Sequence, residues 1–426
     1  MQIYNYPDSS NWKQIIQRPF MDTTLLEKSI RRIMEKVKDN GDKALRKYCK
    51  EFDGVKLKKF LVTEKELSNA EAVLSNDLKK AIQQAKQNIE IFHAAQKEVV
   101  KKIETMPGVV CWRSSVAIEK IGLYIPGGSA PLFSTVLMLA VPAIIAGCNE
   151  IVLCTPPSKD GSIHPAILYT ANLCGLHKIF KVGGAHAIAA MAFGTESIPK
   201  VFKIFGPGNQ YVTYAKQLVQ RRSVAIDMPA GPSEVLIIAD ETAVPEFVVA
   251  DLLSQAEHGP DSQVVLVTTS ESFAEKVLVE IEKQIKELPR KEIIQHALQN
   301  SKLVTVKDLN EAVALSNLYA PEHLILSCAN AEQLADKIIS AGSVFLGNYS
   351  PESAGDYASG TNHTLPTNGY AAMYSGVSLD SFLKKITYQQ ITKEGLQNIG
   401  STVMEMAGAE GLDAHKNAVA IRLKNN

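Results

Sequence analysis

The sequence lacks the features that mark membrane-embedded and secreted proteins. No apolar run reaches the roughly 18 residues that a membrane helix needs, and the longest candidate, residues 136–146, is short and contains Pro142. The initial segment MQIYNYPDSSNW has neither the basic start nor the apolar core of a secretory signal. We therefore expect no membrane partner.

Excess charge and paired cysteines are missing as well. The 45 Lys and Arg residues balance the 45 Asp and Glu residues, so no bulk electrostatic attraction to nucleic acid follows. None of the six cysteines forms a CxxC pair, and six in 426 residues make no disulfide framework. Reduced thiols and a cytoplasmic location are the plain expectation.

What is present is the composition of an ordinary globular protein. The chain is 46% hydrophobic and 21% charged, and at roughly 100–200 residues per domain its length allows two to four domains. The first hundred residues look helical and polar. We expect helices over residues 23–40, 42–52 and 67–97, with the Asn40-Gly41 pair ending the first.

From about residue 118 onward, short β-rich runs alternate with helical segments. The first series predicts strands at 121–125, 151–154, 179–182 and 201–205, and helices at 135–146, 163–173, 188–193 and 211–220. The second predicts strands at 235–239, 263–268, 303–306, 324–326 and 343–346, and helices at 245–258 and 273–298. Strand, crossover, strand repeated in this way predicts parallel sheets with right-handed connections, hence two α/β units.

Glycine turns follow several of these strands. A glycine that follows a parallel strand lies at the carboxyl edge of its sheet, where α/β folds bind ligands. A single such turn is explained by the tight connection between a strand and a helix and needs no ligand. Three turns on one sheet favour a crevice large enough for a nucleotide. No GxGxxG fingerprint occurs, so the standard dinucleotide motif is absent. The turns are Gly127-Gly128, Gly183-Gly184 and Gly206-Pro207-Gly208.

The best local metal pattern is Gln255 and His258 in SQAEHGP, because residues three apart share a helix face. A metal there would need remote ligands, such as Asp356 in the irregular segment 348–370 or His415 near the end of the chain. Spacing alone leaves the alternative open, since a histidine at a helix end is more often a solvated cap. The irregular segment itself is typical of a functional loop.

A second candidate is Glu322-His323 in LYAPEHLIL. A carboxylate beside an imidazole, in a polar notch between apolar runs, indicates acid–base chemistry, although an exposed polar turn is the commoner case. Cys111, Cys148 and Cys154 could serve as nucleophiles, but buried structural thiols are more frequent.

Several long blocks resemble the histidinol dehydrogenase family, in the expected order and over essentially the whole chain. The blocks are GLYIPGGSAPLFSTVLMLAVPAIIAGC, KIFGPGNQYV, DMPAGPSEV, SQAEHGPDSQ, YAPEHL and AGDYASGTNHTLPT. The resemblance implies oxidation of L-histidinol to L-histidine through L-histidinaldehyde, the last step of histidine biosynthesis, with NAD+ as hydride acceptor and one Zn2+ per site. It also implies a homodimer whose site is shared between subunits.

The same resemblance implies a fold of two incomplete Rossmann-like, aldehyde-dehydrogenase-like α/β domains with parallel sheets and small helical terminal domains. We accordingly expect an N-terminal arm (1–20), an α/β substrate and zinc domain (21–120 and 232–377), an α/β NAD-binding domain (121–231) and a helical dimerisation domain (378–426).

Site residues carry over one by one. By resemblance, Glu322 and His323 are the catalytic pair. The zinc ligands are Gln255, His258 and Asp356, with His415 arriving from the partner chain. Substrate contacts are these four zinc ligands together with His323, Ser233, His363 and Glu410, and the NAD contacts are Tyr124, His186 and Asn209. His186 departs from the family pattern, which often has Gln at that position.

Two alternatives remain at this point. One is a metal-free, aldehyde dehydrogenase-like enzyme with a nucleophile such as Cys148. The other is a non-catalytic protein that binds a ligand in a paired α/β cleft. Neither accounts for Gln255, His258 and the APEHL block together.

Overall fold

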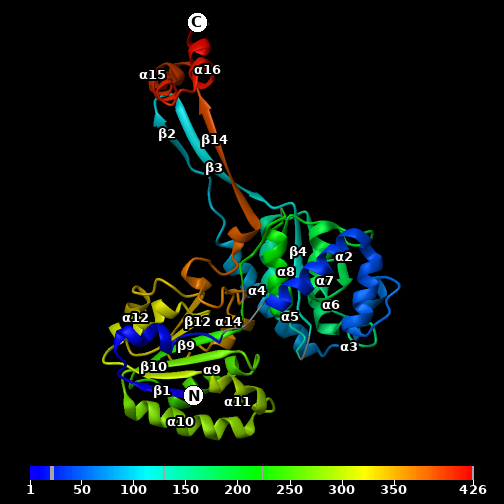
Figure 1. Ribbon diagram of the computed structural model, residues 1–426, viewed down its shortest axis with the longest axis vertical. Coiled ribbons are helices and arrows are strands. Elements are labelled where there is room, and N and C mark those ends of the chain that lie inside the picture. Colours follow the sequence, from blue (N-terminus) through cyan, green and yellow to red (C-terminus); the bar gives the residue numbers. More distant parts are fainter. Residues whose placement is uncertain (20–23, 128–129, 223, 230, 425–426) are drawn as a thin grey trace.

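The structure is a computed structural model that describes residues 1–19, 24–127, 130–222, 224–229 and 231–424. Two α/β units lie side by side, and a long arm projects from them and carries the last two helices at its tip (Figure 1). Among the described helices, none is long and apolar enough to cross a membrane.

The first unit contains a five-stranded sheet in the order β6-β5-β4-β7-β8, with every pair parallel, as the alternating pattern predicts. Its strands are β4 (Lys120–Tyr124), β5 (Glu150–Thr155), β6 (Ile179–Lys181), β7 (Lys203–Phe205) and β8 (Ala225–Ile226). Its crossover helices are α5 (Phe133–Ala146), α6 (Pro165–Leu173), α7 (Gly184–Phe193) and α8 (Gln210–Gln220). The strands are mostly apolar because helices cover both faces of the sheet.

The N-terminal helices cover this same unit. Helix α2 (Thr24–Tyr48) packs on α7 and α8 and is kinked at Gly41, whose φ of 49° few other residues adopt. The expected helix over 67–97 is instead two helices, α3 (Glu64–Val73) on α6 and α4 (Asn76–Ala94) on α5, because Ser75 caps the second. Thus residues 24–94 pack on the five-stranded sheet, whereas the sequence-based division groups them with residues 232–377.

The second unit contains a six-stranded parallel sheet in the order β1-β11-β10-β9-β12-β13. Its strands are β1 (Gln2–Asn5), β9 (Glu234–Ala239), β10 (Gln263–Thr268), β11 (Lys302–Thr305), β12 (His323–Ser327) and β13 (Ser343–Leu346). Its helices are α1 (Trp12–Ile15), α9 (Pro245–Ala256), α10 (Glu271–Gln284), α11 (Lys291–Gln299), α12 (Leu309–Tyr319), α13 (Ala331–Ala335) and α14 (Glu352–Tyr357). The N-terminal segment is therefore not a free arm but an edge strand, and Trp12 and Ile15 join the core.

Three details of this unit differ from expectation. Helix α9 ends at Ala256, so His258 lies in the turn beyond the helix. The expected helix over 273–298 is divided by a 3-10 turn at Ile285–Glu287, next to Pro289. The irregular segment 348–370 contains the short helix α14.

The arm is an antiparallel sheet in the order β14-β3-β2, with α15 and α16 at its far end (Figure 1). Its elements are β2 (Lys102–Met106), β3 (Val109–Ala117), β14 (Leu383–Ile391), α15 (Lys393–Ala409) and α16 (Asp413–Lys424). The sequence pattern missed β2 and β3, because β2 is exposed, β3 is mostly half-buried and neither shows clear apolar alternation.

Candidate functional site

Ionisable side chains gather at the amino edge of the six-stranded sheet. Glu234 and His323 are the first residues of the neighbouring strands β9 and β12, and Glu322 directly precedes β12. The segment containing α14 brings Glu352 and Asp356 to the same place, and α9 brings Gln255. We refer to Glu322, His323, Glu352, Asp356, Gln255 and His258 as the acidic cluster.

His323 lies at the centre of the acidic cluster and is buried. Its Nδ1 lies 3.2 Å from the carbonyl oxygen of Glu234 and 3.7 Å from Glu322 Oε2, and its Nε2 lies 3.5 Å from Asp356 Oδ1. Because Nδ1 is within hydrogen-bond distance of a carbonyl oxygen, it donates there, and Nε2 faces the carboxylate of Asp356. Neither His323 Nε2 nor Asp356 Oδ1 has a hydrogen bond to the described residues.

The charges of the acidic cluster are strongly interdependent. Burial alone would lower the pKa of His323, but the carboxylates of Glu352, Glu322 and Asp356 raise it to about 10. Burial raises the pKa of Glu322 and that of Glu352 to about 8 each, despite the nearby imidazole. The imidazole thus faces more carboxylates than it can neutralise, which favours a further cation at this place.

Gln255, His258 and Asp356 meet as the resemblance implies, together with Glu352. Ligand atoms of His258, Glu352 and Asp356 all lie within 4.8 Å of one another. The buried amide of Gln255 is oriented by its surroundings, with its nitrogen donating to Glu352 and its oxygen 3.1 Å from the Glu234 amide nitrogen. Sequence reasoning missed Glu352, although its spacing of four from Asp356 on a short helix could have indicated it.

His363 connects the acidic cluster to the first unit. Its Nδ1 lies 2.8 Å from the carbonyl oxygen of Asp356, and its Nε2 lies 3.1 Å from the hydroxyl of Thr135 on α5. A small cavity of about 120 Å³ adjoins the cluster, and Ser233, Glu322 and His363 all line it. The acidic cluster therefore lies together with Ser233 and His363, although these residues come from segments far apart in the sequence.

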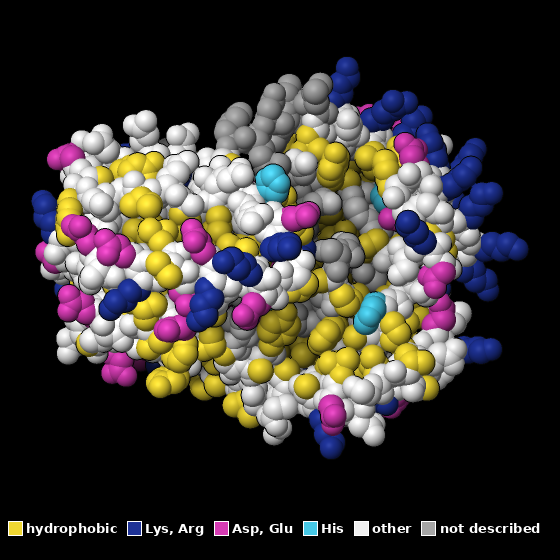
Figure 2. All heavy atoms as spheres, turned by 90° about the horizontal axis from the view of Figure 1, so that it is seen from below, with side chains coloured by type: hydrophobic (Ala, Val, Ile, Leu, Met, Phe, Trp, Pro, Cys, Tyr) yellow, Lys and Arg dark blue, Asp and Glu magenta, His cyan; other side chains and the backbone are white. Residues whose placement is uncertain are grey.

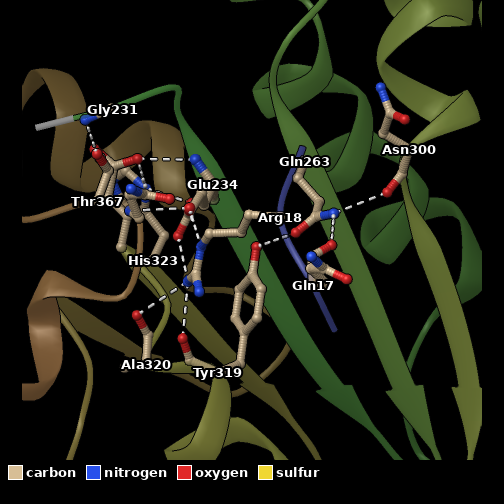
Figure 3. A network of polar contacts seen from close by, with 12 residues as sticks. Gln17, Arg18, Gly231, Glu234, Gln263, Asn300, Tyr319, Ala320, His323 and Thr367 are labelled. Atoms are coloured by element: carbon tan, nitrogen blue, oxygen red, sulfur yellow. Dashed lines mark hydrogen bonds and ion pairs between the residues drawn. The ribbon is translucent and has the colours of Figure 1, made fainter. Parts of the chain in front are cut away.

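Contacts of Glu234 and Arg18 hold these side chains in place, and sequence reasoning missed both residues (Figure 3). Glu322 Oε2 accepts a hydrogen bond of 2.9 Å from the amide of Glu234. The carboxylate of Glu234 receives two hydrogen bonds from Arg18, at 2.5 and 2.8 Å, and one of 2.9 Å from the amide of Asn368. The guanidinium of Arg18 also lies 3.9 Å from the centre of the Tyr319 ring. A segment near the N-terminus thereby fixes the start of β9.

Glu410 and His415 are not part of this assembly within one chain. Glu410 caps the end of α15 and His415 lies on α16, both at the tip of the arm and far from the acidic cluster (Figure 1). Both residues are exposed.

A much larger cavity opens at the carboxyl edge of the five-stranded sheet. It has a volume of about 1200 Å³, and Tyr124, His186 and Asn209, the expected NAD contacts, all line it. Seen from the end of the molecule opposite the arm, the surface is hollowed between the two units, with apolar and histidine side chains around the hollow (Figure 2).

Two of these residues, Tyr124 and Asn209, are held by contacts with the helix starts beside them. The hydroxyl of Tyr124, at the end of β4, accepts a hydrogen bond of 3.0 Å from the amide of Gly184 at the start of α7. Asn209 caps α8, with its side-chain oxygen accepting from the amides of Tyr211 and Val212. The start of a helix carries a partial positive charge, which suits an anionic group such as a pyrophosphate.

The glycine turns divide between the two cavities. Gly127 and Gly184 line the large one, whereas Gly206 and Gly208 line the small one, and Gly128 lies outside the described residues. Gly206 adopts φ 127°, a conformation that favours glycine. The single crevice expected from all three turns is thus two neighbouring spaces.

None of the six cysteines lines either cavity. Cys148 is half-buried, and burial raises the pKa of its thiol to about 11, so it is protonated at neutral pH. Cys148 therefore finds no support as a nucleophile, which weakens the metal-free alternative.

Comparisons with known proteins agree on one family. The family profile described as histidinol dehydrogenase matches residues 16–423. The chain is 61% identical over 423 residues to histidinol dehydrogenase of Bacteroides thetaiotaomicron, covering 99% of each chain, and 52% identical to that of Escherichia coli K12, covering 99% of this chain and 96% of the other.

A solved structure supports the same relationship. The crystal structure of histidinol dehydrogenase from Elizabethkingia anophelis matches with a TM-score of 0.98 and 60% identity, covering 100% of this chain and 98% of that one. These findings confirm the resemblance stated from the sequence blocks and the α/β fold with parallel sheets. The chain belongs to the histidinol dehydrogenase family, the oxidoreductases that carry out the final step of histidine biosynthesis.

Proposed function

We propose that this chain oxidises L-histidinol to L-histidine in two steps through L-histidinaldehyde, with chemistry at the acidic cluster and NAD+ in the large cavity. The observation that carries the proposal is the position of His323, a buried imidazole between the carboxylates of Glu322 and Asp356. The acidic neighbours hold the pKa of this imidazole high, and a bound cation would lower that pKa, so that the neutral imidazole is suited to accept the hydroxyl proton of an alcohol.

The residues of the acidic cluster fit a zinc ion. Asp356 Oδ1 and His323 Nε2 are buried without a hydrogen bond to the described residues, and His258, Glu352 and Asp356 present nitrogen and oxygen ligand atoms to one another. His258 and Asp356 would hold the ion, with Gln255 beside them. When bound, zinc supplies a positive centre that orients the nitrogen atoms of the substrate.

A second copy of the chain would complete the site. His415 and Glu410 lie exposed on the arm, away from the acidic cluster of their own chain. We expect His415 of the second copy to ligate the ion and Glu410 to contact the substrate's cationic groups. The arm projects away from both α/β units and carries α15 and α16 at its tip (Figure 1).

In the first oxidation, His323 removes the proton of the substrate hydroxyl as hydride leaves the adjacent carbon. NAD+, when bound, accepts that hydride. His363 and Ser233 border the small cavity beside Glu322 and would orient the substrate there. The proton held by His323 then passes to solvent or to Glu322, whose carboxyl lies 3.7 Å away.

In the second oxidation, the aldehyde first gains water. Glu322 takes a proton from that water as the water oxygen bonds to the carbonyl carbon, which gives the hydrate anion. A second NAD+ would accept the hydride that leaves this carbon as the carboxylic acid forms. The anchoring of Glu322 by the Glu234 amide fixes the direction of its carboxylate for this role. Keeping the aldehyde bound between steps protects a reactive intermediate from release.

Metal analysis coupled to NAD+ reduction tests the proposal. We expect one zinc per chain in the purified protein, growth of NADH absorbance with histidinol, and loss of both after chelation with recovery on adding zinc. Asp356→Asn should lose zinc and activity together, whereas the exposed His177→Asn should change neither. Full activity in the metal-free protein would overturn the zinc assignment, and absence of NADH formation by the zinc-loaded protein would overturn the function.

A further inference from the structure

A second potential ligand set lies in the wall of the large cavity, away from the acidic cluster. His186 Nε2 lies 3.8 Å from Cys49 Sγ and 3.7 Å from Asp53 Oδ2, and the three ligand atoms are all within 4.8 Å of one another. Cys49 and Asp53 belong to the short π-helical turn that follows α2, and His186 lies in the first turn of α7.

The separations suit a single small metal ion. With Zn–N of about 2.0 Å and Zn–S of about 2.3 Å, a tetrahedral angle separates nitrogen and sulfur by about 3.5 Å, close to the observed distance. Thiolate, imidazole and carboxylate form a typical donor set for zinc and cobalt. Little movement would therefore be needed to close the three ligands around an ion.

The burial of these groups gives a second, independent observation. The side chain of His186 is 2% exposed and that of Asp53 14%, yet Asp53 Oδ2 has no hydrogen bond to the described residues. Cys49 is fully buried behind them. Asp53 and His186 both line the large cavity, so an ion from solvent has a path to the ligands and space for a water molecule as fourth ligand.

We propose that Cys49, Asp53 and His186 form a binding site for a divalent transition metal, distinct from the acidic cluster, whose occupation competes with the cofactor. The competition rests on the proposed function, because His186 is also an expected NAD contact. Binding breaks the S–H bond of Cys49, releases its proton to solvent and directs the sulfur lone pair to the metal, without any change of oxidation state.

Cobalt(II) is the probe that separates this site from the acidic cluster. Thiolate coordination gives cobalt(II) an intense near-ultraviolet charge-transfer band, and the acidic cluster contains no cysteine. We expect the whole protein, titrated with Co2+, to develop this band. The band should disappear in Cys49→Ser and weaken in Asp53→Asn, and it should persist in Cys328→Ser, which removes a buried thiol elsewhere.

His186→Gln gives an independent check, because glutamine keeps a hydrogen-bonding side chain but loses the imidazole ligand. This substitution should remove the cobalt band, while the circular dichroism spectrum and the melting temperature of the variant match those of the wild type. The check therefore holds even if Cys49→Ser folds poorly. Saturating NAD+ should also suppress the band in the wild type.

The outcomes are decisive in both directions. A wild type without the band, or a band that survives His186→Gln or saturating NAD+, would overturn the inference. If histidinol oxidation is normal in that experiment, the proposed function stays intact. If the zinc-loaded protein does not oxidise histidinol, the proposed function is contradicted, whatever the cobalt spectrum shows.

Discussion

The two α/β units are built alike, yet they use opposite edges of their sheets. The five-stranded unit has its large cavity at the carboxyl ends of its strands, beside Tyr124 and the start of α8. The six-stranded unit gathers its ionisable residues at the amino ends, where Glu234 and His323 begin their strands. The partial positive charge at a helix start suits an extended anionic cofactor, whereas a buried strand start holds a side chain such as His323 rigidly.

The difference in charge follows the difference in task. Carboxylates and imidazoles crowd the acidic cluster, and their mutual fields raise the pKa of His323 to about 10. The large cavity mixes apolar rings such as Phe52 with polar groups and offers space rather than a fixed charge pattern. Under the proposed function, the first unit binds the cofactor and the second carries out the chemistry, so each can be disturbed separately.

Replacing His323 should have the largest effect. We expect His323→Asn to lower kcat by about 10²–10⁴-fold for both oxidations, because asparagine cannot accept the hydroxyl proton. NADH formation from histidinol and from histidinaldehyde measures each step. The Kd for NAD+ should remain near the wild-type value, since the cofactor cavity lies in the other unit. A variant that keeps near-normal kcat would contradict the assigned role.

Glu322→Gln should separate the two steps. The amide keeps an acceptor oxygen for the Glu234 amide but cannot take a proton from water. We expect a fall of about 10²-fold for histidinaldehyde and a clearly smaller one for histidinol. Single-turnover measurements on each substrate make the comparison, and equal losses on both would refute this division between Glu322 and His323.

Arg18→Met tests the support of the site rather than the chemistry. Removing the guanidinium leaves the buried carboxylate of Glu234 without its cation, which costs about 3–5 kcal/mol of unfolding free energy. Denaturant unfolding measures the loss. The exposed Arg31–Glu27 pair provides the control, and Arg31→Met should leave the midpoint nearly unchanged because solvent screens that pair. Equal effects of the two variants would remove the structural role given to Arg18.

Asn209→Ala should have the smallest effect and should touch only the five-stranded unit. Loss of the cap on α8 costs about 1 kcal/mol of stability and raises the KM for NAD+ several-fold, with the KM for histidinol little changed. Asn209→Asp restores the cap but adds a negative charge, so it should recover the stability without recovering the KM. Recovery of both would assign Asn209 a purely structural role.

Much of the fold was predictable because its strands are buried. The strands β4, β5, β9 and β10 appear in the sequence as short apolar runs between turns, and their parallel pairing was expected. The exposed strand β2 and the half-buried strand β3 were missed, since neither shows a regular alternation of apolar and polar residues. The break at Ser75 was missed because a cap in a long amphipathic pattern is a weak signal.

The site was predicted unevenly for a similar reason. The blocks containing Gln255, His258, Glu322 and His323 are contiguous, so resemblance could transfer them residue by residue. Arg18, Glu234 and Glu352 lie in segments without a recognisable pattern, and their importance arises from contacts across long stretches of chain. The zinc and partner assignments stay predictions that the experiments above test.

The sequence by itself determined the family and the parallel α/β units and supplied most candidates for the reactive side chains, because local apolar patterns and long motif blocks are properties of the chain. Only the tertiary structure decided that Arg18 anchors Glu234, that Glu352 joins His258 and Asp356, and that Cys49 meets His186. Such contacts depend on how helices and strands pack in three dimensions. The free energy that stabilises them comes from the burial of side chains from distant segments, which no local sequence pattern reveals.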